Sequence, residues 1–79
     1  MSEPLIGEKF RHYKGREYEV VGYAHHSETG EKMILYKPLY KVRDLEEKYP
    51  TGVVFVRPLD MFLGTVEITG VRQLRFKML

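Results

Sequence analysis

Residues 17–37 constrain the fold most, because two strand-like runs lie on either side of a turn-forming stretch. Over residues 17–24 one set of alternating side chains is apolar or small, and the other set is half polar. The first set is Tyr18, Val20, Gly22 and Ala24, and the second is Glu17, Glu19, Val21 and Tyr23. This alternation is typical of a strand with one buried face.

The second run, residues 32–37, is rich in side chains that suit a pleated surface, and Pro38 has no N–H to continue the ladder. The stretch between the runs contains Gly30, which can adopt the positive φ of a hairpin loop. Ser27 or Thr29 can also bond back to the turn backbone. We therefore predict an antiparallel β-hairpin over residues 17–37.

A further strand is predicted at residues 53–56, where four consecutive apolar side chains lie between a glycine and an arginine. An uninterrupted apolar run is typical of a strand buried on both faces, so we expect it at the centre of the sheet. Pro58 ends this strand and suits the first position of a helix. We predict one helical turn over residues 58–62, with Leu59 and Phe62 on its inner side.

Weaker patterns predict strands over residues 8–13, 65–69 and 73–78, separated by glycine-containing breaks. Residues 44–47 resemble the start of a helix, with an acidic cap and a glutamate three residues later. Because Pro50 follows so closely, we expect only a short excursion between strands there.

Short strands with a single helical turn indicate a mainly β fold. We expect either a small SH3-like barrel or a strongly bent antiparallel sheet of about five strands. With 79 residues the chain has no room for a second domain, so residues 1–79 are predicted to form a single domain.

The absence of cysteine excludes a disulfide framework, a thiolate metal site and a thiol nucleophile. The first residues lack the basic start and apolar run of a secretory signal, and no apolar stretch approaches the ~20 residues of a membrane helix. We therefore expect a soluble, cytoplasmic protein with no membrane partner.

Thirteen Lys and Arg residues against eleven Asp and Glu residues give a formal net charge of +2, which is too small to indicate nucleic-acid binding by itself. The basic residues gather in three groups, and acidic residues separate them. The groups are Lys9, Arg11, Lys14 and Arg16, then Lys32, Lys37, Lys41 and Arg43, then Arg72, Arg75 and Lys77. The simplest interpretation is a mixed, solvated surface.

The histidines and their neighbours offer little catalytic chemistry. His25 and His26 are adjacent, so on a strand they point to opposite faces and cannot chelate together. Ser27 and Glu28 follow them, but contiguous turn residues rarely supply the geometry of a catalytic triad. We expect no metal, no cofactor and no catalytic residue, with Glu28 as a general base left open as an alternative.

Two positions favour anion binding. On a strand His12 and Lys14 share one side and could present donors to an anion, although an edge histidine bonded to nearby backbone is the plainer interpretation. Arg57 lies between an apolar run and a proline, where rigid backbone would hold its guanidinium for bidentate capture of phosphate or carboxylate. The alternative is a local ion pair between Arg57 and Asp60 or Glu28.

Aromatic side chains could serve as stacking platforms for bases, although most aromatics on strands are core residues or cross-strand partners. The candidates are Tyr13, Tyr18, Tyr23, Tyr36, Tyr40 and Phe62. The chain has neither a glycine-rich phosphate loop nor a dinucleotide-binding fingerprint.

Taken together, an ordered set of short motifs resembles a family of small bacterial proteins known as domain of unknown function sixteen fifty-three. The motifs are Gly7, residues 11–15, 18–20 and 26–29, Leu39, Tyr40, residues 56–59, Met61, Phe62, Arg75 and Phe76. The resemblance implies a stand-alone bacterial domain without an established activity.

Two departures qualify the resemblance. The family pattern has tryptophan where this chain has Phe55, and a shorter connection where this chain runs from residue 41 to 52. The longer connection weakens any assignment of a site near Tyr40. The polar motif positions are candidates for a shared ligand-binding site, and they are His12, Lys14, Ser27, Glu28, Thr29 and Arg57.

Three functions are therefore open. The first is a binding module in which His12, Lys14, Arg57 and nearby aromatics take an anionic ligand, such as a nucleotide or nucleic acid. The second is a small hydrolase or transferase that uses Glu28 as a base with support from Arg57. The third is a structural homodimer or adaptor whose exposed strand edges pair with another chain.

Overall fold

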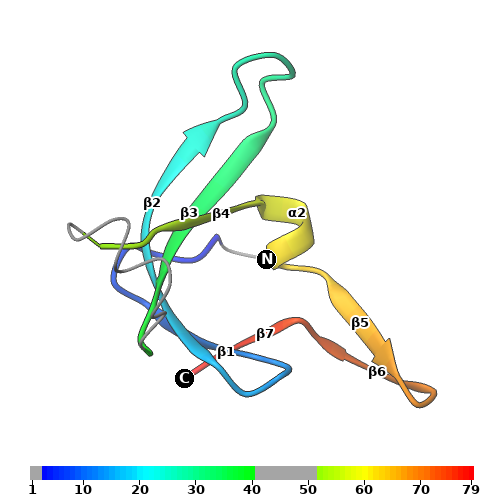
Figure 1. Cartoon of the computed structure of the whole chain (residues 1–79). Helices are drawn as coiled ribbons and strands as arrows, with labels where there is room; N and C mark the ends of the chain where they lie inside the picture. The colour runs from blue at the N-terminus through cyan, green and yellow to red at the C-terminus, as the bar shows by residue number, and fades with distance from the viewer. Residues whose placement is uncertain (1–2, 41–51) are drawn as a thin grey trace.

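The computed structural model describes residues 3–40 and 52–79. Within these residues seven strands form a five-stranded antiparallel sheet and a separate two-stranded sheet, and the chain has one short helix (Figure 1). The elements are β1 (Lys9–His12), β2 (Glu17–His25), β3 (Lys32–Pro38), β4 (Phe55–Pro58), α2 (Leu59–Phe62), β5 (Thr65–Ile68), β6 (Val71–Leu74) and β7 (Phe76–Met78). The prediction of a mainly β fold with a single helical turn is confirmed.

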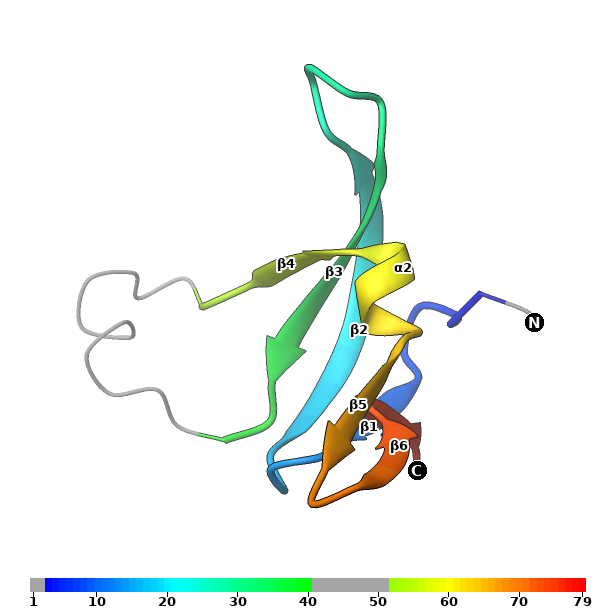
Figure 2. The ribbon, with the colours of Figure 1, turned by 90° about the vertical axis from the view of Figure 1, so that its right-hand side faces the viewer.

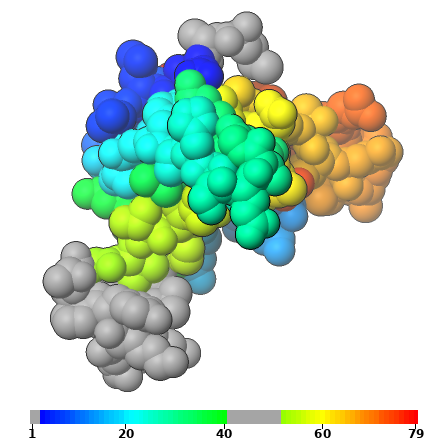
Figure 3. All heavy atoms as spheres, turned by 90° about the horizontal axis from the view of Figure 1, so that it is seen from above, coloured from blue at the N-terminus to red at the C-terminus, as the bar shows by residue number. Residues whose placement is uncertain are grey.

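The larger sheet has the strand order β4-β3-β2-β1-β7, so β4 and β7 are its edges. No ladder joins these two edges within the described residues, and the sheet is strongly bent rather than closed into a barrel (Figure 2). The hairpin β5–β6 projects from this sheet as a separate arm, shown in orange in Figure 3.

The predicted hairpin over residues 17–37 is confirmed, because β2 pairs with β3 in an antiparallel ladder. Gly30 has a φ of 74°, as its place in the connecting turn required. Of the two hydroxyl side chains proposed to bond to the turn, Thr29 does so: its Oγ1 accepts the backbone N–H of Glu31 at 3.1 Å.

The predicted division of β2 into two faces is wrong beyond Val20. The register of β2 against β3 shifts between Val20 and Gly22, which marks a β-bulge. One extra residue inverts the alternation that follows it. Tyr23 therefore lies opposite Ile34 and packs against the core, on the same side of the sheet as Val20.

The prediction that residues 53–56 form a central strand buried on both faces is also wrong. β4 begins only at Phe55, it lies at the edge of the sheet, and Val54 and Val56 are each 55% exposed. The apolar run indicated strand structure, but whether a second layer covers the outer face depends on the rest of the chain.

The helical turn after Pro58 is confirmed, with Leu59 and Phe62 buried on its inner side. The weak strands over residues 8–13 and 65–69 correspond to β1 and β5. The predicted last strand, residues 73–78, is instead divided at Arg75 between β6 and β7, which belong to different sheets. The excursion predicted at residues 44–47 lies outside the described residues.

The core lies on the concave side of the bent sheet, where α2 covers part of it. Its centre is the parallel stack of Phe62 on Phe76, whose ring centroids are 4.0 Å apart. The buried apolar residues are Phe10, Val20, Ile34, Tyr36, Leu59, Phe62 and Phe76. Among the helices of residues 3–40 and 52–79, none is long and apolar enough to cross a membrane.

Candidate functional site

Strand register places basic and aromatic side chains together on the concave side of the sheet. Residues that face each other across an antiparallel ladder direct their side chains to the same face. Such pairs include His12 with Phe76 and Ile34 with Arg57. We call this region the cation–aromatic face, and it comprises His12, Lys14, Arg16, Tyr18, Tyr36, Tyr40, Phe55, Arg57, Arg75 and Phe76.

Tyr18 is the centre of the aromatic part of the face. Its ring lies 5.3 Å from the ring of Tyr36, 5.6 Å from that of Tyr40 and 5.9 Å from that of Phe76, in edge-to-face arrangements. The hydroxyls of Tyr18 and Tyr40 form a hydrogen bond of 2.9 Å. Burial and this hydrogen bond raise the pKa of Tyr18 above its ordinary value.

Arg57 is held in place by neighbours on three elements. Its Nε donates to the hydroxyl of Tyr36 at 3.1 Å, and its Nη1 lies 3.6 Å from the sulfur of Met61. Its guanidinium carbon is 5.7 Å from the centre of the Phe76 ring. No carboxylate in residues 3–40 or 52–79 pairs with it, so the predicted alternative of an ion pair with Asp60 or Glu28 is not formed.

His12 lies beside Phe76, with ring centroids 4.9 Å apart. Its Nδ1 accepts the backbone N–H of Lys14 at 3.2 Å, so a neutral ring carries its proton on Nε2. Burial lowers the pKa of His12, and the positive charges of Arg57, Arg75 and Lys14 lower it further. His12 is therefore a neutral donor surrounded by three cations.

Arg75 and Arg16 extend the positive charge to the two ends of the face. Arg75 sits between β6 and β7, where its backbone N–H donates to Gly64 O and its carbonyl accepts from Tyr13. The Nε of Arg75 is buried and has no hydrogen-bond partner among the described residues. Arg16 packs its guanidinium 4.6 Å from the centre of the Tyr40 ring.

Three of the predicted site residues do not join this face. Ser27, Glu28 and Thr29 are exposed in the turn between β2 and β3. Arg57 faces Ile34, so this turn lies on the order of 15 Å further along the hairpin at about 3.3 Å per residue. Figure 1 shows the turn projecting away from α2 and β7.

The structure therefore brings His12, Lys14 and Arg57 close together and leaves Glu28 apart. The pairing of Glu28 with Arg57 that a hydrolase or transferase would need is not formed. Among the described residues, no three His, Asp or Glu side chains gather in a way that could hold a metal ion.

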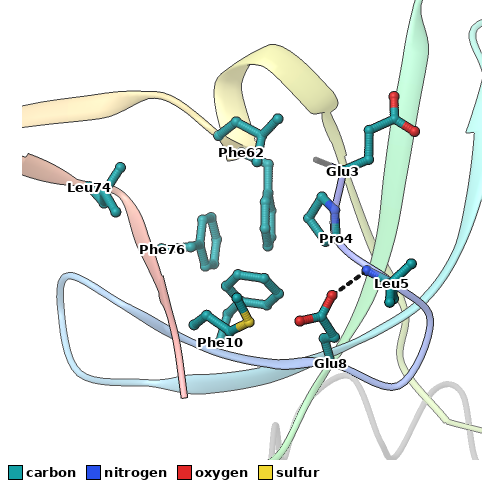
Figure 4. A pocket seen from close by; sticks show the side chains of 10 residues that line it. Glu3, Pro4, Leu5, Glu8, Phe10, Phe62, Leu74 and Phe76 are labelled. Atoms are coloured by element: carbon teal, nitrogen blue, oxygen red, sulfur yellow. Dashed lines mark hydrogen bonds between the residues drawn. The ribbon is translucent and has the colours of Figure 1, made fainter. Parts of the chain in front are cut away.

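A second region is a cavity of about 460 Å³ at the other end of the core (Figure 4). Its floor consists of Phe10, Phe62 and Phe76. Leu63, Leu74, Met78 and the segment Pro4 and Leu5 form its walls, and Glu3 and Glu8 also line it. The Glu8 carboxylate faces the rings, whereas the Glu3 carboxylate points away from them (Figure 4). We call it the acidic pocket.

Sequence reasoning missed Arg16 and Arg75 as site residues and missed the acidic pocket entirely. Arg75 did carry a signal, because the dipeptide Arg75-Phe76 belongs to the motif set described above. The pocket carried none, since its lining comes from the N-terminal segment, β1, α2, β6 and β7, which only the tertiary structure brings together.

Comparisons with known proteins agree with the resemblance predicted from the sequence. The model of the family described as "Protein of unknown function (DUF1653)" matches residues 8–78. The fold is similar to a crystal structure of a DUF1653 protein from Bordetella bronchiseptica, with 31% sequence identity and a TM-score of 0.70. That similarity covers 92% of this chain and 83% of the other. A search of curated proteins finds no significant match.

Proposed function

This chain belongs to the DUF1653 family of proteins of unknown function, and we propose that it is a binding module for a phosphate-bearing nucleobase ligand. The ligand is either a mononucleotide or a short single strand of nucleic acid, since both present the same two chemical groups. The binding site is the cation–aromatic face.

The observation that carries this proposal is a group of cations, without acidic partners among residues 3–40 and 52–79, beside a half-buried aromatic surface. The ion pairs of the described residues involve Arg11 with Glu17, Lys32 with Glu3, and Lys37 with Glu19. None of them uses a basic side chain of the face. Arginines that are fixed and unpaired suit bidentate contacts to phosphate, and such charge-assisted hydrogen bonds are the strong ones.

The phosphate would lie between His12, Arg57 and Arg75. Arg57 is already oriented by its hydrogen bond to Tyr36, so little side-chain entropy is lost when an anion binds. At the same end of the face, the buried Nε–H of Arg75 is a donor without an acceptor in the part of the chain that the structure describes. His12 adds a neutral N–H donor and gains a proton more readily once an anion is present.

The base would stack on the tyrosines next to this phosphate site. Tyr18 and Tyr40 are partly exposed, and Arg16 lies over the Tyr40 ring as a second planar surface. Stacking of a base on an aromatic side chain contributes about 1–3 kcal/mol. The phosphate end of the face has only a few basic side chains near His12, namely Arg57, Arg75 and Lys14, which favours a ligand with few phosphates over a long polyanion.

The test is a titration of the ¹⁵N-labelled protein with adenosine 5′-monophosphate, adenosine, inorganic phosphate and a five-nucleotide oligouridylate, each at 50 and 200 mM salt. We expect the monophosphate to bind more tightly than adenosine or phosphate, with shift changes at Tyr18, Phe76 and the Arg57 side chain. Tighter and more salt-sensitive binding of the oligonucleotide would identify the single strand as the ligand. Equal binding of adenosine and its monophosphate, or no binding at the face, would refute the proposal.

The prediction of a homodimer or adaptor stays a prediction. It would be tested by light scattering at micromolar concentration, where a monomer counts against the homodimer.

A further inference from the structure

The floor of the acidic pocket is made of three phenylalanine rings. Phe62 stacks on Phe76, and the Phe10 ring meets Phe62 edge to face with centroids 5.3 Å apart (Figure 4). Leu74 and Met78 stand at the open side and are 43% and 64% exposed. The cavity of about 460 Å³ falls within the roughly 300–1,000 Å³ of small-molecule sites.

Among the described residues that line this pocket, the only ionisable ones are Glu3 and Glu8. One oxygen of Glu8 accepts the backbone N–H of Leu5 at 2.6 Å, which fixes the orientation of the carboxylate. The other oxygen of Glu8 has no partner among the described residues. Glu3 pairs with Lys32 at 2.6 Å, and Lys32 is not part of the pocket lining.

The Glu8 carboxylate therefore gives the pocket a negative charge that no basic residue of its lining offsets, whereas the charge of Glu3 is paired with Lys32. Tyr23 on β2 is affected by both glutamates. Burial raises the pKa of Tyr23, and the charges of Glu3 and Glu8 raise it further. Its hydroxyl donates to the carbonyl of Pro4, which holds the N-terminal segment against β2 as a wall of the pocket.

Charge and shape together indicate one class of occupant. An apolar body would displace water from the three phenylalanines, and burial of its apolar surface favours binding. An ammonium group would meet the free oxygen of Glu8 and would also be attracted to the faces of aromatic rings. A carboxylate or phosphate would be repelled by Glu8.

We propose that the acidic pocket is a second ligand site, which binds an organic ammonium ion carrying an aromatic or branched aliphatic body. This site is independent of the proposed nucleotide site. The two regions share Phe76 but no ionisable side chain, so either proposal can fail while the other holds.

The test uses three probes of nearly equal shape: phenethylammonium, 2-phenylethanol and 3-phenylpropanoate. Binding is followed by NMR on the full chain, through the methyl groups of Leu74 and Met78. We expect the ammonium to bind about tenfold more tightly than the alcohol, and the carboxylate to bind least. Equal affinities of the three probes, or shifts confined to the cation–aromatic face, would overturn the proposal.

Matched variants separate the pocket carboxylate from total charge. Glu8→Gln should abolish the preference for the ammonium over the alcohol, because the amide oxygen keeps the hydrogen bond to Leu5 while the charge is lost. Glu31→Gln removes the same charge from the exposed β2–β3 turn and should leave the preference unchanged. A preference that survives Glu8→Gln, or that Glu31→Gln also removes, contradicts the proposal.

A further variant, Leu74→Lys, tests the proposal even if Glu8→Gln disturbs the N-terminal segment. Leu74→Lys changes a partly exposed side chain at the open side of the pocket, where a lysine can be accommodated. It should exclude the ammonium and improve binding of 3-phenylpropanoate severalfold. Retention of ammonium binding in this variant would place the probe outside the pocket.

Discussion

The cation–aromatic face and the acidic pocket are built around the same stacked rings but carry opposite charge. The face contains Arg57, Arg75 and a neutral His12, whereas Glu3 and Glu8 line the pocket. Phe76 belongs to both regions. The comparison shows that a net charge of +2 says little about any one site, because positive and negative groups are segregated at two ends of one small core.

The two regions also differ in what holds them together. Residues of the face lie on or beside the five-stranded sheet, where ladder hydrogen bonds fix most of their backbones. One wall of the pocket is instead the irregular segment before β1. It is attached by the hydrogen bond from Tyr23 and by bonds of Gly7 and Glu8 to the backbone of Val20. Changes to the core should therefore affect both regions, and changes to charge should affect only one.

Removal of the Phe76 ring should have the largest effect on the free energy of unfolding, because this ring belongs to both regions. Phe76 is 4% exposed and stacks on Phe62. Phe76→Ala should lower the free energy of unfolding by about 3–5 kcal/mol, measured by urea denaturation. Phe76→Leu, which keeps most of the volume, should lose less. A loss below 1 kcal/mol for Phe76→Ala would mean that the two regions do not share one core.

Loss of the Arg57 charge should weaken ligand binding at the face and leave ligand binding in the pocket unchanged. A charge-assisted hydrogen bond contributes about 1.5–3 kcal/mol, so Arg57→Gln should reduce affinity for adenosine 5′-monophosphate roughly 10- to 100-fold. Phenethylammonium binding in the pocket should stay unchanged. Arg72→Gln, an exposed position on β6, is the control for net charge. Equal losses in both variants would show that binding depends on overall charge alone.

Titration of His12 should distinguish the face from the pocket by pH. Because its pKa in the folded state lies below the unperturbed value of 6.5, the unfolded chain binds more protons between those two values. Stability should therefore fall as the pH drops from 6.5 to the folded pKa of His12, and His12→Gln should flatten this slope.

Adenosine 5′-monophosphate should raise the pKa of His12 in NMR titrations, and phenethylammonium should not. An unchanged pKa with bound monophosphate would remove His12 from the site.

Substitution at the tip of the β2–β3 hairpin should have the smallest effect. Glu28 is exposed and belongs to neither region. Glu28→Gln should change the free energy of unfolding by no more than about 0.5 kcal/mol and leave both ligand affinities unaltered. A several-fold loss of monophosphate affinity would show that the hairpin tip folds over the face when ligand binds.

The structure shows which parts of the site the sequence could predict. His12 and Lys14 are two residues apart in the chain, so the sequence predicted that they lie together, although it placed both on a strand and β1 ends at His12, with Lys14 in the turn that follows. Arg57 joins them because β4 and β7 curve toward each other across the bent sheet, which no local pattern encodes. Ser27, Glu28 and Thr29 were grouped with them through the family resemblance, and strand length separates them from Arg57.

The sequence by itself determined the local elements of this protein, because turns, alternation and proline act over a few residues. The β2–β3 hairpin and the helical turn after Pro58 both followed from such patterns. The tertiary structure alone decided the bulge after Val20, the edge position of β4 and the division of the last strand at Arg75. Each of these depends on which distant segment lies alongside. For the same reason only the folded chain could separate its charges into a cationic aromatic face and an acidic pocket on either side of Phe76.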